Sequence, residues 1–225
     1  NQIIEQTQRL KTGMVQKLLT RGIEHTKFKK VKWYFGKEIE IPEEWELRKL
    51  GDVCELLDSE RIPLKESDRS KMNGNIPYYG ASGVIDYVND YIFDEKLLCL
   101  GEDGENLRSR VKPLAFTIQG KSWVNNHAHV LRPNNLTIHE YLECYLNQIS
   151  VIQHLDFSAQ PKLNQTEMKK IKFTCPSMPE QQQIASILSN IDTQIQKEKL
   201  HKSNLEILKK GLVQKLLRGQ IRVKV

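Results

Sequence analysis

Residues 179–217 constrain the fold more than any other part of the sequence, because they read as one uninterrupted helix with apolar residues at heptad-like spacing. At a rise of about 1.5 Å per residue, this helix would be roughly 55–60 Å long, about twice the diameter of a small domain. Such a length favours a coiled-coil spacer over a core helix of an all-α domain. We expect its stripe to pack on partner helices through Ile184, Leu188, Ile191, Ile195, Leu205, Leu208, Leu212 and Leu216.

The end of this predicted helix occurs twice in the chain. LKTGMVQKLL at residues 10–19 matches LKKGLVQKLL at residues 208–217 in eight of ten positions, so the copies are offset by 198 residues. That offset is far longer than the period of a solenoid repeat. Gly, Val and Gln recur at the same spacing, which argues against chance similarity between two Leu/Lys-rich helices. The sequence therefore suggests one unit of a tandem, with residues 1–26 as the end of a preceding unit.

Between the two copies, the hydrophobic pattern predicts one mixed domain and not a doubly wound fold. Strand-like runs bounded by turn residues cover 76–93, 97–100, 115–118 and 123–132, and a helix is expected over 138–152 with Thr137 as its cap. The polar residues 58–75 predict a mobile loop. The predicted fold class is α+β, divided into the end of a helix (1–26), a basic aromatic linker (27–42), a globular domain (43–178), the long helix (179–217) and a basic tail (218–225).

The charge balance, the lack of long apolar runs and the cysteines indicate which partners and which cellular compartment to expect. Its 34 basic and 28 acidic residues give a net charge of +6, which permits binding to nucleic acid without proving it. No apolar run is long enough to span a membrane and no signal segment opens the chain, so we expect a cytoplasmic protein without a membrane partner. Isolated cysteines predict unpaired thiols instead of disulfides or a zinc site: Cys54, Cys99, Cys144 and Cys175.

The chain lacks the motifs that common nucleic-acid enzymes need. It has no glycine-rich phosphate loop, no Asn/Asp-Pro-Pro-aromatic motif of a methyltransferase, and no well-placed carboxylate trio for a nuclease around Asp86 and Asp94. His127 and His129 would share one face of a strand, as a metal pair requires, but no third ligand is near. Hydrogen-bonded histidines are the preferred interpretation. We therefore expect no catalytic residue, no metal and no cofactor, and a role as a reader or scaffold.

Polar, glycine-rich segments between residues 78 and 164 suit binding to DNA. Basic side chains there would contact phosphates, and amide side chains would bond to base edges. Tyr78 and Tyr79 would fit a core equally well. The predicted DNA-binding residues are Tyr78, Tyr79, Ser82, Arg108, Arg110, Lys121, Asn125, Asn126, Gln160, Lys162 and Asn164.

Several short motifs occur in a characteristic order along the chain. They are Trp45 followed by Leu50-Gly51-Asp52, Ile76-Pro-Tyr-Tyr-Gly-Ala-Ser-Gly83, Gly101-Glu-Asp-Gly104, Asn125-Asn-His-Ala-His-Val130, Gln160-Pro-Lys-Leu-Asn164 and Pro176-Ser-Met-Pro-Glu-Gln-Gln-Gln-Ile184. In this order they closely resemble the target recognition domain and adjoining conserved helix of type I restriction-modification specificity subunits. The resemblance covers nearly the whole chain, and the Pro-Glu-Gln run that leads into the long helix is its most specific part.

The resemblance implies a function and a set of partners. Such subunits resemble a tandem of two recognition domains spaced by antiparallel helices, in which each domain reads one half of a split target in double-stranded DNA. Two methylation subunits dock on the helices and recognition domains, and restriction subunits join later. Catalysis and the S-adenosylmethionine site belong to those partners. The resemblance makes residues 43–178 the second recognition domain, with the first one missing.

The missing helix leads to an expectation about self-association. Residues 1–19 can cover only about half of the long stripe, which leaves 205–217 exposed, and exposed stripes of this length usually find a partner. We expect a homodimer with antiparallel distal helices. Two other functions compete with DNA recognition: a coiled-coil assembly scaffold whose globular domain binds protein, and an autonomous nuclease, which the lack of a carboxylate cluster disfavours.

Overall fold

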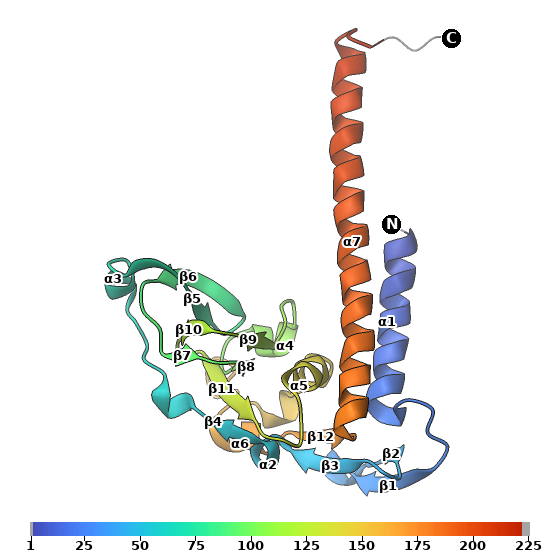
Figure 1. Ribbon diagram of the computed structural model, residues 1–225, viewed down its shortest axis with the longest axis vertical. Coiled ribbons are helices and arrows are strands. Elements are labelled where there is room, and N and C mark those ends of the chain that lie inside the picture. Colours follow the sequence, from blue (N-terminus) through green and yellow to red (C-terminus); the bar gives the residue numbers. More distant parts are fainter. Residues whose placement is uncertain (1, 222–225) are drawn as a thin grey trace. The chain divides into compact units, whose positions relative to one another are not determined.

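The computed structural model describes residues 2–221, which fall into two units (Figure 1). The helical unit combines the residues up to Lys17 with those from Ser186 on, and the sheet unit is Leu18–Ala185. Two helices contribute to both units: α1 (Gln2–Arg21) and α7 (Met178–Leu217). The predicted fold class is confirmed, because the chain is mixed α+β and carries one long C-terminal helix. Among the described residues, no helix is long and apolar enough to cross a membrane.

Helix α7 begins one residue before the predicted start and ends at the predicted residue. Its helix-forming Gln, Lys, Glu and Leu residues support a helix of 40 residues. It stops because Gly219 adopts a left-handed backbone conformation (φ +69°), as Gly22 does after α1 (φ +67°). Within the helical unit, α1 lies antiparallel beside the first half of α7 (Figure 1), and an ion pair joins Lys11 Nζ to Asp192 Oδ1 at 2.5 Å.

Four sheets are present in the described part of the sheet unit. Two have four strands, in the orders β6-β5-β10-β7 and β4-β11-β8-β9, and two have two strands, β1-β2 and β12-β3. Strands β5 and β10 are parallel, and the other neighbouring strands are antiparallel. The strands are β1 (Phe28–Lys32), β2 (Glu38–Pro42), β3 (Glu46–Lys49), β4 (Cys54–Leu56), β5 (Asn73–Gly80), β6 (Gly83–Val88), β7 (Phe93–Asp94), β8 (Leu97–Gly101), β9 (Ala115–Ile118), β10 (Lys121–Val124), β11 (Ala128–Pro133) and β12 (Lys172–Cys175).

One hydrophobic core joins the two four-stranded sheets. Strand β8 is a continuous apolar run and is buried at every position, as the sequence predicted. Its side chains pack with residues of β7, β9, β10 and β11, and the core consists of Leu57, Phe93, Leu97, Cys99, Ile118, Val124, Ala128 and Val130. The remaining helices are short: α2 (Leu50–Val53), α3 (Glu66–Arg69), α4 (Asn106–Ser109), α5 (His139–Leu146), which packs against β8 and β9, and α6 (Gln165–Lys169). No disulfide links the cysteines of residues 2–221.

Two polar side chains fix the start of α7 within the sheet unit. The Glu180 carboxylate accepts hydrogen bonds from the Trp45 indole (2.8 Å) and the Ile23 backbone N–H (3.0 Å), and lies 2.9 Å from His25 Nε2. The amide of the buried Gln181 bonds to backbone carbonyls on the segments that precede α5 and α7. The Pro-Glu-Gln run is therefore an anchor between the long helix and the domain before it.

Three predicted elements differ from the structure. The expected linker contains the β1–β2 hairpin, in which the lysines of 28–32 lie opposite the glutamates and isoleucines of 38–42. The single strand expected over 123–132 is divided between β10 and β11, because the Asn125 side chain accepts a hydrogen bond from the His127 N–H (2.9 Å) and turns the chain. The helix expected to reach residue 152 ends at Leu146, where the next side chain, Asn147, turns to β9 and bonds to its backbone.

Two side chains also differ from their predicted roles. Thr137 does not cap α5, whose N-cap is Ile138; its hydroxyl donates instead to Gln181 Oε1 at 2.9 Å. The polar composition of segment 58–75 predicts a mobile loop, but Asp58 is buried and a short helix, α3, forms within the segment. Because the whole segment is polar, its composition did not indicate that Asp58 is buried.

Candidate nucleic-acid interface

Four motifs that are distant in the sequence lie next to one another in the sheet unit. They are the segments 79–83, 101–104, 125–127 and 160–164, and together they form what we call the motif surface. Backbone hydrogen bonds join neighbouring segments, from Asn125 N to Tyr79 O (3.0 Å), Glu102 N to His127 O (2.9 Å), Leu163 N to Glu102 O (2.8 Å) and Gly104 N to Pro161 O (3.1 Å). The fold therefore collects the predicted binding segments into one place.

Glycine is required where two of these segments approach most closely. A Cβ atom on Gly101 would lie 2.9 Å from the carbonyl oxygen of Ala81, closer than real Cβ contacts occur. Gly104 has a φ of +101°, a conformation that L side chains rarely adopt. In the Gly-Glu-Asp-Gly motif, Gly101 thus allows the close contact and Gly104 allows the turn. Together they position Glu102 and Asp103, which lie between them.

A buried group of four charged side chains, Asp58, Arg61, Glu102 and His129, supports the motif surface. Arg61 donates to Glu102 Oε2 (2.8 Å) and to the Ala128 carbonyl (2.6 Å), and its Nη2 lies 3.2 Å from Asp58 Oδ2. His129 Nδ1 lies 2.6 Å from the same Asp58 oxygen. We call these four residues the ionic cluster. Because they come from the segment after β4, the Gly101–Gly104 loop and β11, they hold those segments together.

The protonation of the ionic cluster follows from its hydrogen bonds. His129 Nε2 lies 2.7 Å from the Leu163 carbonyl, which can only accept, so this nitrogen carries a proton. Burial raises the pKa of Asp58, but hydrogen bonds from His129 and the Val130 N–H and the charge of Arg61 outweigh it, leaving the pKa below its usual value. Arg61 thus pairs with the carboxylates of Asp58 and Glu102.

The ionic cluster also has a spacing that a metal ion could use. Ligand atoms of Asp58, Glu102 and His129 all lie within 4.8 Å of one another. Arg61 already contacts both carboxylates, and both ring nitrogens of His129 have partners, so a metal ion would have to break these contacts. The residues therefore fit a structural ion-pair network better than a metal site. The interpretation of both His127 and His129 as hydrogen-bonded histidines is confirmed.

Six predicted binding residues keep polar atoms accessible. On the motif surface, Asn126, Gln160 and Lys162 are exposed and Ser82 is half-buried, while Lys162 Nζ lies 3.2 Å from Glu102 Oε1. Arg108, on α4 next to this surface, is exposed, and its guanidinium lies 5.9 Å from the centre of the Phe157 ring. Lys121 is also exposed, but it begins β10, at the opposite end from Asn125, and lies over Tyr91.

The other five predicted binding residues form contacts that shape the fold, and Asn164 is the exposed member of this group. Tyr78 is buried in the core and its hydroxyl accepts from Leu64 N, while Tyr79 stacks on Phe116 with ring centres 5.7 Å apart. Asn125 and Asn164 accept backbone hydrogen bonds that shape the turn before β11 and the start of α6. Arg110 donates to the carbonyls of Leu146 and Ile149. We assign these side chains to the scaffold, and we leave them out of the interface proposed below.

Sequence reasoning missed several residues that build this site. Phe157 is half-exposed in a polar segment with no periodic pattern that could mark it. Arg61 and Asp58 lie in the segment 58–75, whose composition indicated only a solvated loop. Asp103 belongs to a recognised motif, but its contact with His127 Nδ1 (2.8 Å) joins residues 24 positions apart, a pairing that sequence spacing does not reveal.

The predicted partner-helix residues divide into two groups. The proximal group is covered: Ile184, Leu188 and Ile195 are buried and Ile191 is half-buried. These residues lie within eight positions of Asp192, which forms the ion pair with Lys11 of α1. The distal group is exposed, with 51% of Leu205, 62% of Leu208, 53% of Leu212 and 42% of Leu216 accessible. Only the distal group is available to a partner as the structure stands.

Comparisons with known proteins agree on one family. Residues 42–207 match the family model described as the type I restriction modification DNA specificity domain. A putative type I restriction enzyme specificity subunit of Haemophilus influenzae is 32% identical over 148 residues, which are 64% of this chain and 37% of that protein. The putative MjaX specificity subunit of Methanocaldococcus jannaschii is 29% identical over 239 residues, covering all of this chain and 53% of that protein.

Solved structures show the same fold. The S subunit of the type I restriction-modification system from M. genitalium superimposes with a TM-score of 0.65 at 17% identity, covering 96% of this chain and 55% of that one. The HsdS subunit from Thermoanaerobacter tengcongensis gives a TM-score of 0.58 at 14% identity, covering 98% and 53%. The chain thus spans about half the length of these structures.

Proposed function

Because the chain belongs to the type I restriction modification DNA specificity domain family, we propose that its sheet unit reads one half of a split target in double-stranded DNA. The observation that carries this proposal is the convergence of four separate motifs on one polar surface, supported from within by the ionic cluster. The family match does not favour the alternative of an assembly scaffold whose globular domain binds protein.

The exposed side chains suit two kinds of DNA contact. Lys162 and Arg108 offer positive charge for phosphates, which positions a protein on the duplex without reading sequence. Asn126 and Gln160 offer amide groups that can bond in pairs to adenine in the major groove. Phe157 adds an apolar surface beside Arg108, suited to a thymine methyl group or a sugar. Specificity would therefore depend on the two amides, and affinity on the two cations.

The helical unit supplies the proposed scaffold. Methylation subunits would dock on the long helix and the recognition domain, restriction subunits would join that complex, and catalysis would reside in those partners. The chain itself would contribute no catalytic group, metal or cofactor, and would act in the cytoplasm. The apolar side chains exposed along α7 after residue 200 support a further part of the proposal, which is self-association through the distal helices.

Selection from a random DNA pool tests the proposal. The 225-residue chain, alone and with its methylation subunits, is mixed with duplexes that carry a randomised core, and the bound fraction is sequenced. Enrichment of a short defined motif is the expected result, with affinity that falls as salt rises. Binding without sequence enrichment, or none at all in either preparation, would contradict a reading function.

A further inference from the structure

Residues 33–37 form the tip of the β1–β2 hairpin, which we call the hairpin tip, and one side chain there does not stabilise the fold. Phe35 adopts a left-handed backbone conformation (φ +55°, ψ +34°), which a bulky L residue rarely takes. The residue is also 85% exposed, so its ring gains little from burial. Asparagine or glycine would take the same conformation with less strain. A strained and exposed aromatic residue therefore points to a role in binding.

The backbone on either side of Phe35 is held against the sheet unit. The Tyr34 hydroxyl accepts a hydrogen bond from the Lys172 backbone N–H, and its ring packs edge-on against His154 with ring centres 5.0 Å apart. The Lys172 ammonium lies 5.3 Å from the centre of the Tyr34 ring and donates to the Trp33 carbonyl at 3.3 Å. The hairpin tip is therefore in place before anything binds, so little ordering is needed on binding.

Two adjoining hollows of the sheet unit connect the hairpin tip with the motif surface. One, of about 260 Å³, lies between the hairpin tip and the segment 149–153. The other, of about 270 Å³, lies between the segment 147–152 and Arg108, which is next to the motif surface. Ile149 and Ser150 line both hollows, so the two share a wall. The motif surface, the two hollows and the hairpin tip thus follow one another.

The two hollows carry the charge that a phosphate backbone requires. Lys37, Arg108 and Arg110 line them, and no carboxylate of the described residues does. Lys37 and Arg108 are exposed. The buried Nη1 atom of Arg110 has no hydrogen-bond partner among the residues that the structure describes, although Nη2 holds two backbone carbonyls. Positive charge without a matching carboxylate attracts a polyanion.

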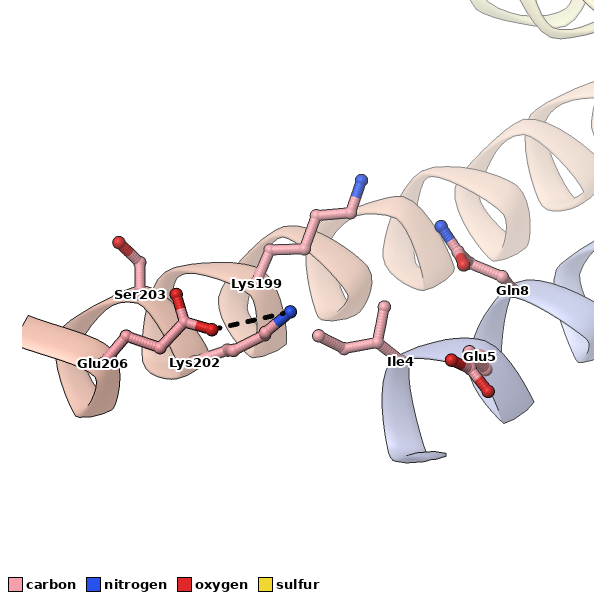
Figure 2. A pocket seen from close by; sticks show the side chains of 7 residues that line it. All are labelled: Ile4, Glu5, Gln8, Lys199, Lys202, Ser203 and Glu206. Atoms are coloured by element: carbon pink, nitrogen blue, oxygen red, sulfur yellow. Dashed lines mark ion pairs between the residues drawn. The ribbon is translucent and has the colours of Figure 1, made fainter. Parts of the chain in front are cut away.

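A hollow in the helical unit provides a comparison. It has a volume of about 470 Å³ and lies between the start of α1 and the middle of α7 (Figure 2). Lys199 and Lys202 line it together with Glu5 and Glu206, and Lys202 Nζ lies 3.7 Å from Glu206 Oε1. Its two cations are thus balanced by two carboxylates. A polyanion would be attracted to the hollows of the sheet unit and not to this one.

We infer that the duplex adjoining the proposed half-target lies over the two hollows and meets the hairpin tip. There Lys37 would bind a phosphate, and Phe35 would pack against a deoxyribose ring. Such contacts carry no sequence information, because phosphates and sugars are the same throughout DNA. The inference rests on the proposed reading of DNA by the motif surface. It adds a second region of contact that strengthens binding without changing the target.

An acidic protein is the alternative occupant of the hairpin tip. The stiffness of DNA favours a duplex, because the persistence length of DNA is about 150 base pairs. A duplex that leaves the motif surface past Arg108 therefore cannot turn away sharply, and it continues over the hollows. An acidic protein at the hairpin tip would not account for the uncompensated charge beside Arg108.

Duplexes of two lengths test the inference with the 225-residue chain. Each carries the motif enriched in the selection described above, flanked on both sides by about two base pairs or by about twelve, which is just over one helical turn. Fluorescence anisotropy should show several-fold weaker binding of Phe35→Asn and Lys37→Ala to the longer duplex, with unchanged binding to the shorter one. On the longer duplex, Lys37→Ala should also lower the dependence on salt by about one ion.

Three further measurements on variants separate binding from folding. Lys30→Ala removes an exposed lysine of the same hairpin, opposite Glu40 and outside the hairpin tip, and should match the parent chain on both duplexes. Phe35→Trp keeps an aromatic ring and should keep the affinity for the longer duplex. Because asparagine tolerates the left-handed conformation, Phe35→Asn should raise the Tm by about 2–4 °C. Weaker binding by a more stable variant cannot be caused by misfolding.

Hydroxyl-radical footprinting on the longer duplex locates the contact. The parent chain should protect the motif and also base pairs beyond it on one side. The variant that combines Phe35→Asn with Lys37→Ala should protect the motif alone. Protection that ends at the motif in the parent chain would contradict the inference.

Other results would also overturn the inference. Both tip variants could bind the longer duplex as the parent does, or Lys30→Ala could weaken binding as much as Lys37→Ala, which would indicate a general effect of charge. Tip variants that bind DNA normally but lose a methylation subunit would assign the hairpin tip to a protein partner. A selection that enriches no motif contradicts the proposed function and this inference together, whereas an enriched motif with no effect of the flanks contradicts this inference alone.

Discussion

Individual side chains divide the proposed interface into residues that bind and residues that support. Asn126, Gln160 and Lys162 project from segments whose backbones are fixed by hydrogen bonds to neighbouring segments. Beneath them, Arg61 pairs with the two buried carboxylates of Asp58 and Glu102. Changes in the first group should alter DNA binding at constant stability, whereas changes in the ionic cluster should alter stability first.

Replacing Lys162 should weaken binding to every DNA sequence by a similar factor. The Lys162→Ala variant loses one phosphate contact, so its affinity should fall several-fold and its dependence on salt should become shallower by about one ion. Fluorescence anisotropy at several salt concentrations measures both. Lys169→Ala removes another exposed lysine, outside the motif surface, and should match the parent chain. A loss confined to one DNA sequence would instead indicate that Lys162 reads a base.

Replacing Asp58 should destabilise the sheet unit in a manner that depends on pH. Asp58→Asn removes the buried carboxylate that contacts both Arg61 and His129, so that Glu102 is the remaining carboxylate of the ionic cluster, and should cost about 3–5 kcal/mol near neutral pH. The pKa of Asp58 is lowered in the folded state, so its contribution is present above the unfolded pKa of about 3.9 and is lost as pH falls through the folded value. The difference between parent and variant should therefore shrink in acid.

Urea unfolding of the parent and of Asp58→Asn at several pH values between neutral and acid measures this difference. Asp94→Asn, which removes an exposed carboxylate, serves as the control and should stay close to the parent throughout. A gap between Asp58→Asn and the parent that stays constant down to the lowest pH would show that Asp58 does not act through its charge.

At the scale of elements, the ends of the helices are fixed by single residues. Gly22 ends α1 in a left-handed conformation, and a Cβ atom there would lie 2.5 Å from Glu180 Oε1 and 2.6 Å from the Trp45 ring. Glu180 in turn holds Trp45 and the chain after α1. The end of one helix and the start of the other therefore depend on one compact group of contacts in the sheet unit.

Two glycines of the α1 segment should respond to alanine in opposite directions. Gly22→Ala introduces both a strained backbone and a steric clash, and should destabilise the protein by more than about 1 kcal/mol. Gly13→Ala lies inside α1 with nothing within 4 Å of the new Cβ, and should stabilise the helix by about 1 kcal/mol. Thermal unfolding followed by circular dichroism compares the two. Destabilisation by both would show that α1 does not depend on helix propensity.

Replacing Glu180 should loosen the anchor of α7. Glu180→Gln removes a charge and one of the acceptor oxygens that serve Trp45 and Ile23, and should cost about 1–3 kcal/mol of folding free energy. Chemical unfolding monitored by tryptophan fluorescence measures this cost, with a shift of the folded-state emission if the Trp45 indole loses its partner. Glu43→Gln, an exposed control in the same segment as Trp45, should change neither quantity.

At the scale of the whole molecule, the chain combines the motif surface, for which we propose DNA reading, with a largely apolar helix stripe. The proposed DNA binding releases counterions and should weaken steeply as salt rises. The proposed self-association buries leucine and valine side chains and should change little with salt, because exposed ion pairs contribute weakly. Fluorescence anisotropy with DNA and sedimentation equilibrium without it, both between 50 and about 300 mM salt, should therefore diverge. Parallel loss of both activities would imply that they depend on the same charged contacts.

The sequence by itself determined the elements that depend on local pattern. The heptad-like spacing predicted α7 to within one residue at its start, and the glycines after each repeated segment predicted both helix ends. The buried strand β8 followed from its continuous apolar run. These features depend on neighbours within a few positions, so periodicity and turn chemistry are sufficient to identify them.

Only the tertiary structure decided which polar residues are free to bind. Tyr78, Arg110 and Asn125 resemble binding residues in sequence, but long-range packing gives them partners inside the protein. Asp58 resembles a loop residue, yet it is paired with His129, which is 71 positions away. Such contacts depend on how separate strands meet, and that information lies in the register of the sheets and not in local spacing. The sequence located the motifs, and the fold assigned their individual roles.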